Sequence, residues 1–542
     1  MLVADVLRKN AAEFADEIAL VEINPEKDAK SGWKEFELVE AKPSVRFRRE
    51  ITWQEFDRRA NRFANLLLAK GYKKGDKIAI LLMNSIEWLP IYFGVLKMGG
   101  IAVPFNFRYS ADEILYCLKL SEATALIIGT EFIDRVAQIK DQAVNLKTLL
   151  YFGHTKPDFA EDYRELTAAM SDEDPMIPVV EEDDAAIYFS SGTTGFPKAI
   201  LHTHSSVFSA CVTENKHHSQ THDDIFLCIP PLYHTGAKMH WFGSFLVGGR
   251  GVILKGIKPE WILRAVSEEN CTIVWLLVPW AQDILDAIDG GELNPADYQL
   301  DQWRLMHIGA QPVPPSLIKR WKEHFPKHDY DTNYGLSESI GPGCVHLGVE
   351  NIHKVGAIGV PGYGWEIMIA DEQGNPVKQG DVGELYIKGP GVMKCYYNDE
   401  KATAATLKNG WLLSGDMAKQ DEDGFIYLVD RKKDVIITGG ENIYPVQIED
   451  FLRANQKIKD VAVIGLPEKR LGEITAAIIE VKPGMELMEE EVNEFCLDLP
   501  RYKRPRKVIF DSVPRNPTGK IEKPKLRERY CAETLVEAQM HS

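Results

Sequence analysis

The stretch YFSSGTTGFPKAI, residues 188–200, gathers hydroxyl-bearing and small residues ahead of a lysine. Glycine permits dihedrals that expose backbone N–H groups, and consecutive N–H groups with neighbouring hydroxyls form a concave site for an anion. Lys198 adds a positive charge. The stretch therefore predicts a polyphosphate-binding loop, with a plain solvent-facing turn as the alternative. It lacks the Gly-Lys-Ser/Thr ending of a Walker A loop, so a P-loop NTPase is not expected. The residues concerned are Ser190, Ser191, Gly192, Thr193, Thr194, Gly195 and Lys198.

The whole chain has the composition of a soluble globular protein. It has 542 residues, of which 45% are hydrophobic and 26% are charged, and this length predicts two to four domains. A formal net charge of −17 argues against nucleic acid as the main partner. Eight scattered cysteines without a metal-binding spacing are typical of a reducing compartment.

No membrane or export segment is expected. The N-terminal residues contain acids throughout and lack the apolar core of a signal peptide. The most apolar run, CTIVWLLVPW (271–280), is about half the length that spans a bilayer and predicts a buried strand. We therefore expect no integral membrane segment and a cytoplasmic location.

Helical and strand-like patterns alternate in the N-terminal half. Residues 51–72 predict a helix that starts with a capping box at Thr52 and Glu55 and stops at Gly71. The apolar run 77–83 predicts a strand, 86–100 a helix and 101–106 a further strand. This alternation predicts an α/β fold of layered sheets with parallel strands.

The pattern changes twice further along the chain. From about residue 355 to 430, glycines and short alternating strands predict a β subdomain. After Arg431, the helical and strand-like runs start again and predict a small α+β domain of about a hundred residues. We therefore expect an N-terminal domain over 1–430, a hinge at 431–433 and a mobile C-terminal domain over 434–542.

Four further motifs accompany the glycine- and hydroxyl-rich loop, in the order NYGLSES (333–339), GWLLSGDMA (410–418), DRKKDVIITGGENIYPVQIE (430–449) and NPTGKIEK (516–523). Together the five resemble the motifs of the adenylate-forming superfamily, and within it the acyl-CoA synthetases. The resemblance covers essentially residues 50–525, and Ser337 stands where the family more often has threonine. Residues 24–50 depart from the family pattern, because this segment is longer than the usual N-terminal hairpin.

This resemblance implies a two-step reaction that uses ATP, Mg²⁺ and CoA. A carboxylate attacks the α-phosphorus of ATP and gives an acyl-adenylate and pyrophosphate, and the CoA thiol then displaces AMP. Such attack of an anion on a polyanion depends mainly on charge neutralisation. The resemblance gives catalytic roles to Lys520, Glu338, Thr193 and His234, with Glu338 as the Mg²⁺ ligand.

The resemblance also assigns the remaining contacts. Beyond the phosphate loop, ATP is expected to contact Gly309, Ala310, Gln311, Asn333, Tyr334, Gly335, Ser337, Asp416 and Arg431. Lys433 is the expected hinge about which the C-terminal domain rotates, and Gly439, Gly440 and Glu441 are expected at the CoA tunnel. The expected acyl pocket consists of His234, Thr235, Met239, Trp241, Gly335 and Leu336.

The acyl substrate stays open. A medium- to long-chain fatty acid is expected, with an aromatic acid as the alternative. A ligase that loads a carrier protein, a luciferase-like oxygenase and a non-catalytic nucleotide-binding protein are the other hypotheses. A homodimer is expected by analogy only. Residues 24–50 form a long segment that predicts a β ribbon or an oligomer contact, without a chemical role.

Overall fold

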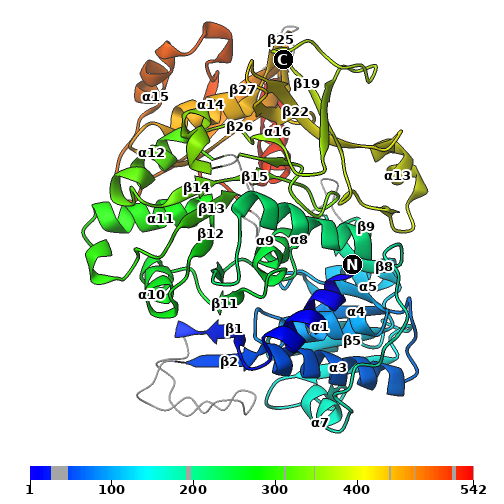
Figure 1. Ribbon diagram of the computed structural model, residues 1–542. Helices are drawn as coiled ribbons and strands as arrows, with labels where there is room; N and C mark the ends of the chain where they lie inside the picture. The colour runs from blue at the N-terminus through cyan, green and yellow to red at the C-terminus, as the bar shows by residue number, and fades with distance from the viewer. Residues whose placement is uncertain are drawn as a thin grey trace.

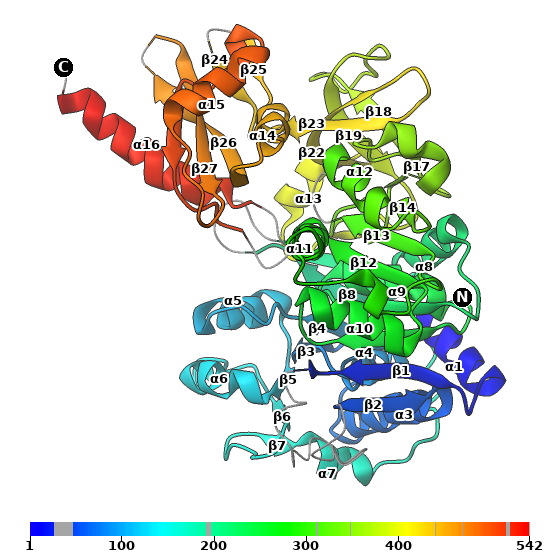
Figure 2. The same ribbon diagram turned by 90° about the vertical axis from the view of Figure 1, so that its left-hand side faces the viewer.

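The computed structural model describes residues 1–25, 47–190, 197–309, 313–346, 348–438, 441–468, 470–515 and 521–540. Two large sheets with their helices make up the N-terminal part, and a β subdomain lies above them (Figure 1). The C-terminal unit, coloured orange to red, stands to one side of both (Figure 2).

The first large sheet has eight strands, and its central strands run parallel. Such strands are buried on both faces, which explains their continuous apolar runs. In spatial order they are β20 (Cys395–Tyr396), β9 (Ala199–Thr203), β8 (Asp184–Phe189), β4 (Ile101–Pro104), β3 (Lys77–Leu81), β5 (Ala125–Gly129), β6 (Thr148–Phe152) and β7 (Glu161–Asp162). Strands β8 and β9 form an antiparallel hairpin that flanks the predicted phosphate loop.

The second large sheet has seven strands, all parallel to their neighbours except the last pair. In spatial order they are β14 (Asp329–Asp331), β13 (Leu305–Gly309), β12 (Ile273–Leu277), β10 (Ile225–Cys228), β11 (Arg250–Leu254), β1 (Ile18–Ile23) and β2 (Arg48–Thr52). The antiparallel pair β1–β2 brackets most of the long segment at 24–50, whose residues 26–46 lie outside the described part.

Alternating side chains of these strands build three separate cores. In β12, Trp275 faces the layer between the two sheets, whereas Val274 and Leu276 face the outer side. The middle layer contains α1 (Val3–Glu13), α3 (Trp53–Ala69), α4 (Trp88–Lys97), α7 (Tyr163–Ala168), α8 (His204–His218) and α9 (Thr235–Phe245). The outer layers contain α10 (Pro259–Glu269), α11 (Val278–Asp289) and α12 (Pro315–His324) on one side, and α5 (Ala111–Ser121) and α6 (Ile133–Ile139) on the other. The order is therefore helix, sheet, helix, sheet, helix.

The β subdomain consists of two small antiparallel sheets next to the large ones. One contains β15 (Asn333–Tyr334), β16 (Cys344–Val345) and β17 (Val360–Pro361). The other contains β18 (Glu366–Ala370), β19 (Gly383–Lys388), β22 (Trp411–Gln420), β21 (Leu407–Lys408) and β23 (Ile426–Arg431), with α13 (Glu400–Thr406) beside them.

The C-terminal unit has its own sheet and its own buried clusters. Its strands are β25 (Glu441–Ile443), β24 (Ile436–Thr438), β27 (Gly472–Val481), β26 (Ile458–Glu468) and β28 (Lys507–Phe510). Helices α14 (Pro445–Arg453), α15 (Glu489–Phe495) and α16 (Lys523–Met540) complete it. The chain enters this unit directly from β23 through residues 432–435.

The mixed α/β fold predicted from the sequence is confirmed. Thr52 caps α3 by accepting a hydrogen bond from the Glu55 N–H, and Gly71 follows this helix with a positive φ of 86°. The expected strand over 271–280 is shorter: β12 ends at Leu277, and α11 begins at Val278 because Pro279 suits the first turn of a helix. No helix in the described ranges is long and apolar enough to cross a membrane.

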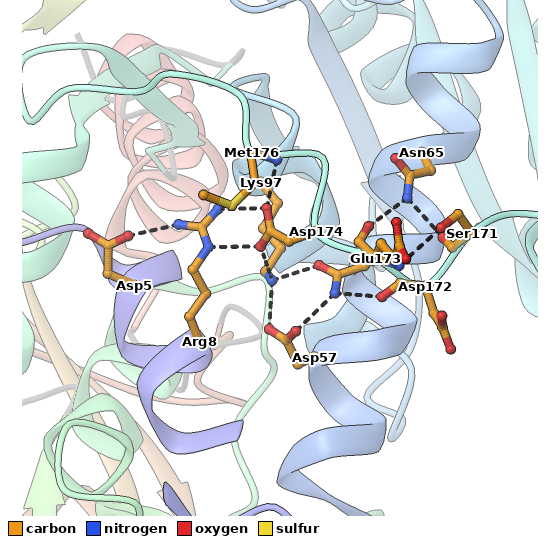
Figure 3. Close-up of polar contacts among 11 residues, drawn as sticks. Asp5, Arg8, Asp57, Asn65, Lys97, Ser171, Asp172, Glu173, Asp174 and Met176 are labelled. Atoms are coloured by element: carbon orange, nitrogen blue, oxygen red, sulfur yellow. Dashed lines mark hydrogen bonds and ion pairs between the residues drawn. The ribbon is translucent and has the colours of Figure 1, made fainter. Parts of the chain in front are cut away.

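The fully buried Lys97 of α4 links α1 to α3 within the middle layer (Figure 3). Lys97 Nζ donates to Asp57 Oδ1 and Asn61 Oδ1, both at 2.6 Å, and to Asp174 Oδ2 at 2.7 Å. The same Asp174 oxygen accepts a hydrogen bond from Arg8 Nε of α1 at 2.8 Å. Burial opposes ionisation of Asp174, yet Arg8 and Lys97 hold its pKa well below the ordinary value.

Replacing Lys97 by methionine should destabilise the protein by about 3–5 kcal/mol, because Asp57 and Asp174 would lose the buried cation between them. Thermal and urea denaturation measure the change, and Lys119→Met, at an exposed position of α5, is the matched control. Equal midpoints for the two variants would contradict this prediction.

Candidate active site

A cleft of about 1420 Å³ lies where the large sheets, the β subdomain and the C-terminal unit meet. Ligands of parallel α/β sheets bind at the carboxyl ends of the strands, and Trp275 of β12, residues after β13 and the N-terminus of α9 border this cleft. Of the predicted site residues, the cleft is lined by Ser190, Lys198, His234, Thr235, Asn333, Tyr334, Gly335, Leu336, Ser337, Glu338, Asp416, Arg431 and Lys433.

Asp416 and Arg431 form a cross-strand ion pair in this cleft. They are direct partners in the register of β22 and β23, and Arg431 Nε lies 2.6 Å from Asp416 Oδ1. The Tyr334 hydroxyl donates a short hydrogen bond to Asp416 Oδ2. Burial and the Asp416 charge together raise the pKa of Tyr334 well above its ordinary value, so the hydroxyl keeps its proton. Three motifs separated in sequence therefore meet at one carboxylate.

Glu338 and Lys198 meet through a tyrosine that the sequence did not point to. The Tyr396 hydroxyl donates to Glu338 Oε1 at 2.8 Å, and Lys198 Nζ lies 4.7 Å from the centre of the Tyr396 ring. Strand β20 places Tyr396 opposite Ile200 of β9, two residues after Lys198. A carboxylate at the cleft surface supplies the hard oxygen ligand that Mg²⁺ prefers, so Glu338 fits the metal.

The ends of the predicted phosphate loop are close together. The Ser190 N–H donates to the Lys198 carbonyl at 3.1 Å, and the Lys198 N–H donates to Ser190 Oγ at 3.3 Å. The loop therefore leaves the hairpin β8–β9 at the cleft. Outside the described residues are Ser191, Gly192, Thr193, Thr194, Gly195, Ala310, Gln311, Gly439, Gly440 and Lys520, together with the side chains of Met239 and Glu441.

His234 is held in place at the start of α9. Its Nδ1 accepts a hydrogen bond from the Gly236 N–H at 3.2 Å. The fully buried Lys238 Nζ donates to the Leu232 carbonyl at 2.7 Å and to the His234 carbonyl at 3.2 Å, and lies 4.7 Å from the Tyr188 ring centre. Burial holds the pKa of Lys238 well below its ordinary value. This lysine therefore fixes the turn that carries His234.

Trp241, one of the residues predicted for the acyl pocket, lies in the hydrophobic core of the middle layer. Its side chain is 1% exposed and packs against Phe242 and Phe245 in the middle layer, and it does not line the cleft. Successive residues of α9 point in different directions, so the residue that reaches the cleft is the neighbouring His240. Gly309 ends β13 next to the cleft: a Cβ there would lie 3.9 Å from Trp275 Nε1 and from Thr332 Oγ1.

The sequence also gave no signal for the polar residues at one end of the cleft. Glu214 of α8, His240 of α9 and Trp275 of β12 line it there, and all three are buried. His240 has apolar neighbours in α9, and Glu214 stands in the polar run TENKHH (213–218) of α8. Neither pattern predicts a specific site.

On the C-terminal side, Asp430 accepts a hydrogen bond from the Val446 N–H at the first turn of α14, at 2.9 Å. Burial raises the pKa of Asp430 to about 6, although the nearby Lys523 opposes this shift. Lys523 Nζ lies 2.8 Å from Glu449 Oε1. The residues on either side of the predicted hinge are thus in direct contact.

Two family models match this chain. The model described as AMP-binding enzyme covers residues 8–397, and the model described as AMP-binding enzyme C-terminal domain covers residues 447–520. The chain belongs to the AMP-binding enzyme family. The resemblance found in its motifs is therefore confirmed.

Proteins of known name resemble this AMP-binding enzyme over nearly its whole length. A long-chain-fatty-acid–CoA ligase, FadD13 of Mycobacterium tuberculosis, is 33% identical over 89% of this chain and 93% of its own. A feruloyl-CoA synthase of an Amycolatopsis species is 33% identical over 89% and 94%. The structure of ATP-bound MatB from Rhodopseudomonas palustris superposes with a TM-score of 0.83 at 26% identity, covering 98% and 99%. This AMP-binding enzyme is an adenylate-forming acid–CoA ligase that uses ATP, Mg²⁺ and CoA.

Lys238→Met should lower the stability of this AMP-binding enzyme by about 1–3 kcal/mol, because two buried carbonyl groups would lose their donor. Differential scanning calorimetry measures the shift, with Lys319→Met on the exposed face of α12 as the control. A Lys238→Met variant with the same melting temperature as the wild type would show that the turn at His234 is stable without this amine.

Proposed function

We propose that this ligase activates a compact carboxylic acid whose far end is polar. The supporting observation is the end of the cleft at Glu214, His240 and Trp275, where polar groups replace the apolar wall that a long alkyl chain requires. An aromatic acid, the alternative in the sequence analysis, fits such a pocket better than a medium- to long-chain fatty acid. The relatives include one named for each class.

In the first step, charge must be neutralised around the triphosphate. We assign the loop from Ser190 to Lys198, including Thr193, to the β- and γ-phosphates, and Lys520 to the reacting α-phosphate and carboxylate. Mg²⁺ held by Glu338 would neutralise phosphate charge. Tyr396 orients the Glu338 carboxylate through its 2.8 Å hydrogen bond, and this contact supports the assignment.

The nucleoside half of ATP is assigned to the Asp416 cluster. A carboxylate accepts hydrogen bonds from both hydroxyls of a ribose. Arg431 and Tyr334 hold the Asp416 carboxylate in one orientation, which supports this assignment because a fixed acceptor loses less entropy on binding. Asn333, Gly335 and Ser337 are assigned to the nucleotide as well, with Gly309, Ala310 and Gln311 on the adenine side.

The second step requires that Lys520 leave and a thiol enter. We assign this change to a rotation of the C-terminal domain about Lys433 that brings Gly439, Gly440 and Glu441 to the CoA tunnel. His234, Thr235 and Leu336 are assigned to the boundary between acyl pocket and tunnel. The contact of Asp430 with the Val446 N–H spans the hinge, so a rotation there would break it.

A screen of carboxylic acids tests the proposed substrate class. Octanoic, hexadecanoic, cinnamic and hydroxylated acids are supplied with ATP, Mg²⁺ and CoA, and pyrophosphate and thioester are both measured. We expect compact acids to give kcat/KM values at least ten times those of hexadecanoic acid. Highest activity on hexadecanoic acid would contradict the proposal and restore the fatty-acid prediction.

Asp416→Asn should raise the KM for ATP by about 10–100-fold, because a hydrogen bond to a charged acceptor contributes about 1.5–3 kcal/mol. The KM for the acid should change much less. ATP–pyrophosphate exchange measures both values, and Asp423→Asn, an exposed position in the turn after β22, is the control. An unchanged KM for ATP would contradict the assignment of Asp416 to the ribose.

A further inference from the structure

The polar end of the cleft is organised around a buried carboxylate. Glu214 is 1% exposed, and its Oε1 accepts a hydrogen bond from Asn333 Nδ2 at 2.7 Å. His240 Nδ1 lies 2.8 Å from the same oxygen, at an angle that makes the contact electrostatic more than a directed hydrogen bond. The contact occupies Nδ1 and leaves Nε2 of the imidazole for the cleft, which His240 lines.

A second histidine compensates the charge behind this pair. His218 Nδ1 lies 3.1 Å from Glu214 Oε2, and its Nε2 lies 2.6 Å from Asp331 Oδ2. Burial disfavours the imidazolium, but the two carboxylates raise the pKa of His218 to about 10. At this separation His218 and Asp331 bond each other directly, which leaves no room for a metal ion between them.

Two polar side chains at this end have no hydrogen-bond partner in the part of the chain that the structure describes. The unpaired atoms are Nε1 of Trp275 and both ring nitrogens of His307. Trp275 is 3% exposed and His307 is 1% exposed. The His307 ring centre lies 4.2 Å from that of His240, and the Trp275 ring centre lies 4.4 Å from it. A buried polar group without a partner is unfavourable, so this end favours a polar ligand.

The shape of the cleft gives access to these groups. Gly236 and His240 lie four residues apart on one face of α9, and Gly236 has no side chain to obstruct the way to His240. A Cβ at Gly236 would approach the Trp275 ring to 3.0 Å. His240 follows His234 by six positions, which corresponds to about 9 Å along the helix.

The chemistry of these groups selects among possible ligand ends. An apolar end would leave Trp275 Nε1–H and His240 Nε2 without partners, and an ammonium group cannot accept the Trp275 proton. A second carboxylate on the ligand would be repelled by Glu214 and Asp331, because the neighbouring histidines carry no excess of positive charge over these two carboxylates. A hydroxyl group both donates and accepts, and it carries no charge.

We propose, in a step that rests on the proposed function, that the acid activated by this ligase carries a hydroxyl group at the end remote from its carboxylate. His240, oriented by Glu214, and Trp275 bind this hydroxyl. His240 and Trp275 thereby determine substrate specificity, whereas Glu214 positions His240. The hydroxyl is expected about 9 Å from His234, which we assign to the boundary between the acyl pocket and the CoA tunnel. This length suits a hydroxylated aromatic acid or a medium-length ω-hydroxy acid.

Two pairs of acids test the proposal, 4-hydroxycinnamic with cinnamic acid and 8-hydroxyoctanoic with octanoic acid. For at least one pair, the wild-type enzyme should favour the hydroxylated member by about tenfold or more in kcat/KM, mainly through KM, as expected when a buried donor would otherwise stay unpaired. His240→Leu should bring this ratio close to one by weakening only the hydroxylated acid. His240→Gln, which keeps a polar group, should retain part of the preference.

Trp275→Phe removes the indole N–H and keeps an aromatic ring. This variant tests the hydroxyl-binding site even if His240→Leu does not fold. It should reduce the preference for the hydroxylated acid at least threefold, while Trp261→Phe, a half-buried position on α10, leaves it unchanged. A wild-type ratio of one or less for both pairs, or an unchanged ratio in Trp275→Phe, would overturn this inference.

The outcomes also separate this inference from the proposed function. Thioester formation from compact acids with no preference for the hydroxyl would reject the hydroxyl-binding site and the polar far end, and would leave only the compact size of the proposed substrate. Higher activity on hexadecanoic acid than on all four compact acids would reject both.

Discussion

The Asp416 carboxylate joins three parts of the molecule at one point. It lies on β22, it pairs with Arg431 on β23, and it accepts a hydrogen bond from Tyr334 on β15 of the neighbouring sheet. Because Asp416 is only 3% exposed, removing either partner would leave a buried charge poorly compensated. Arg431 stands two residues before the predicted hinge at Lys433. The contact on the side of the cleft that we assign to the nucleotide therefore also fixes the place from which the C-terminal unit departs.

Other buried polar and charged side chains are compensated in different ways, and the kind of partner depends on how close the side chain is to the cleft. Lys97, remote from it, is surrounded by two carboxylates and an amide oxygen, as a structural ion pair should be. Lys238, behind the cleft wall, bonds two backbone carbonyls and lies over aromatic rings. Next to the cleft itself, His240 and Trp275 face a space that a substrate would fill.

The contact of Tyr396 with Glu338 illustrates how the sheet positions the site. Strand β20 is only two residues long, yet it adds to the edge of the eight-stranded sheet beside β9. That pairing brings Tyr396 of the β subdomain next to Lys198, at the end of the predicted phosphate loop, with Lys198 Nζ over its ring and its hydroxyl bound to Glu338. Main-chain hydrogen bonds between distant segments thus set the geometry of the charged groups.

The sequence by itself determined the fold class, the helix caps and the family, because these depend on local patterns and on short motifs with fixed spacing. Thr52, Gly71 and the strand-length apolar runs gave the elements, and five motifs gave the reaction. Only the tertiary structure decided that β12 ends at Leu277, that Trp241 faces the core and that Tyr396 meets Glu338. It alone brought Glu214 of α8, His240 of α9 and Trp275 of β12 to one end of the cleft. The physical reason is that side-chain direction and long-range pairing arise from packing between layers, and no local pattern in the chain encodes which buried residues face each other.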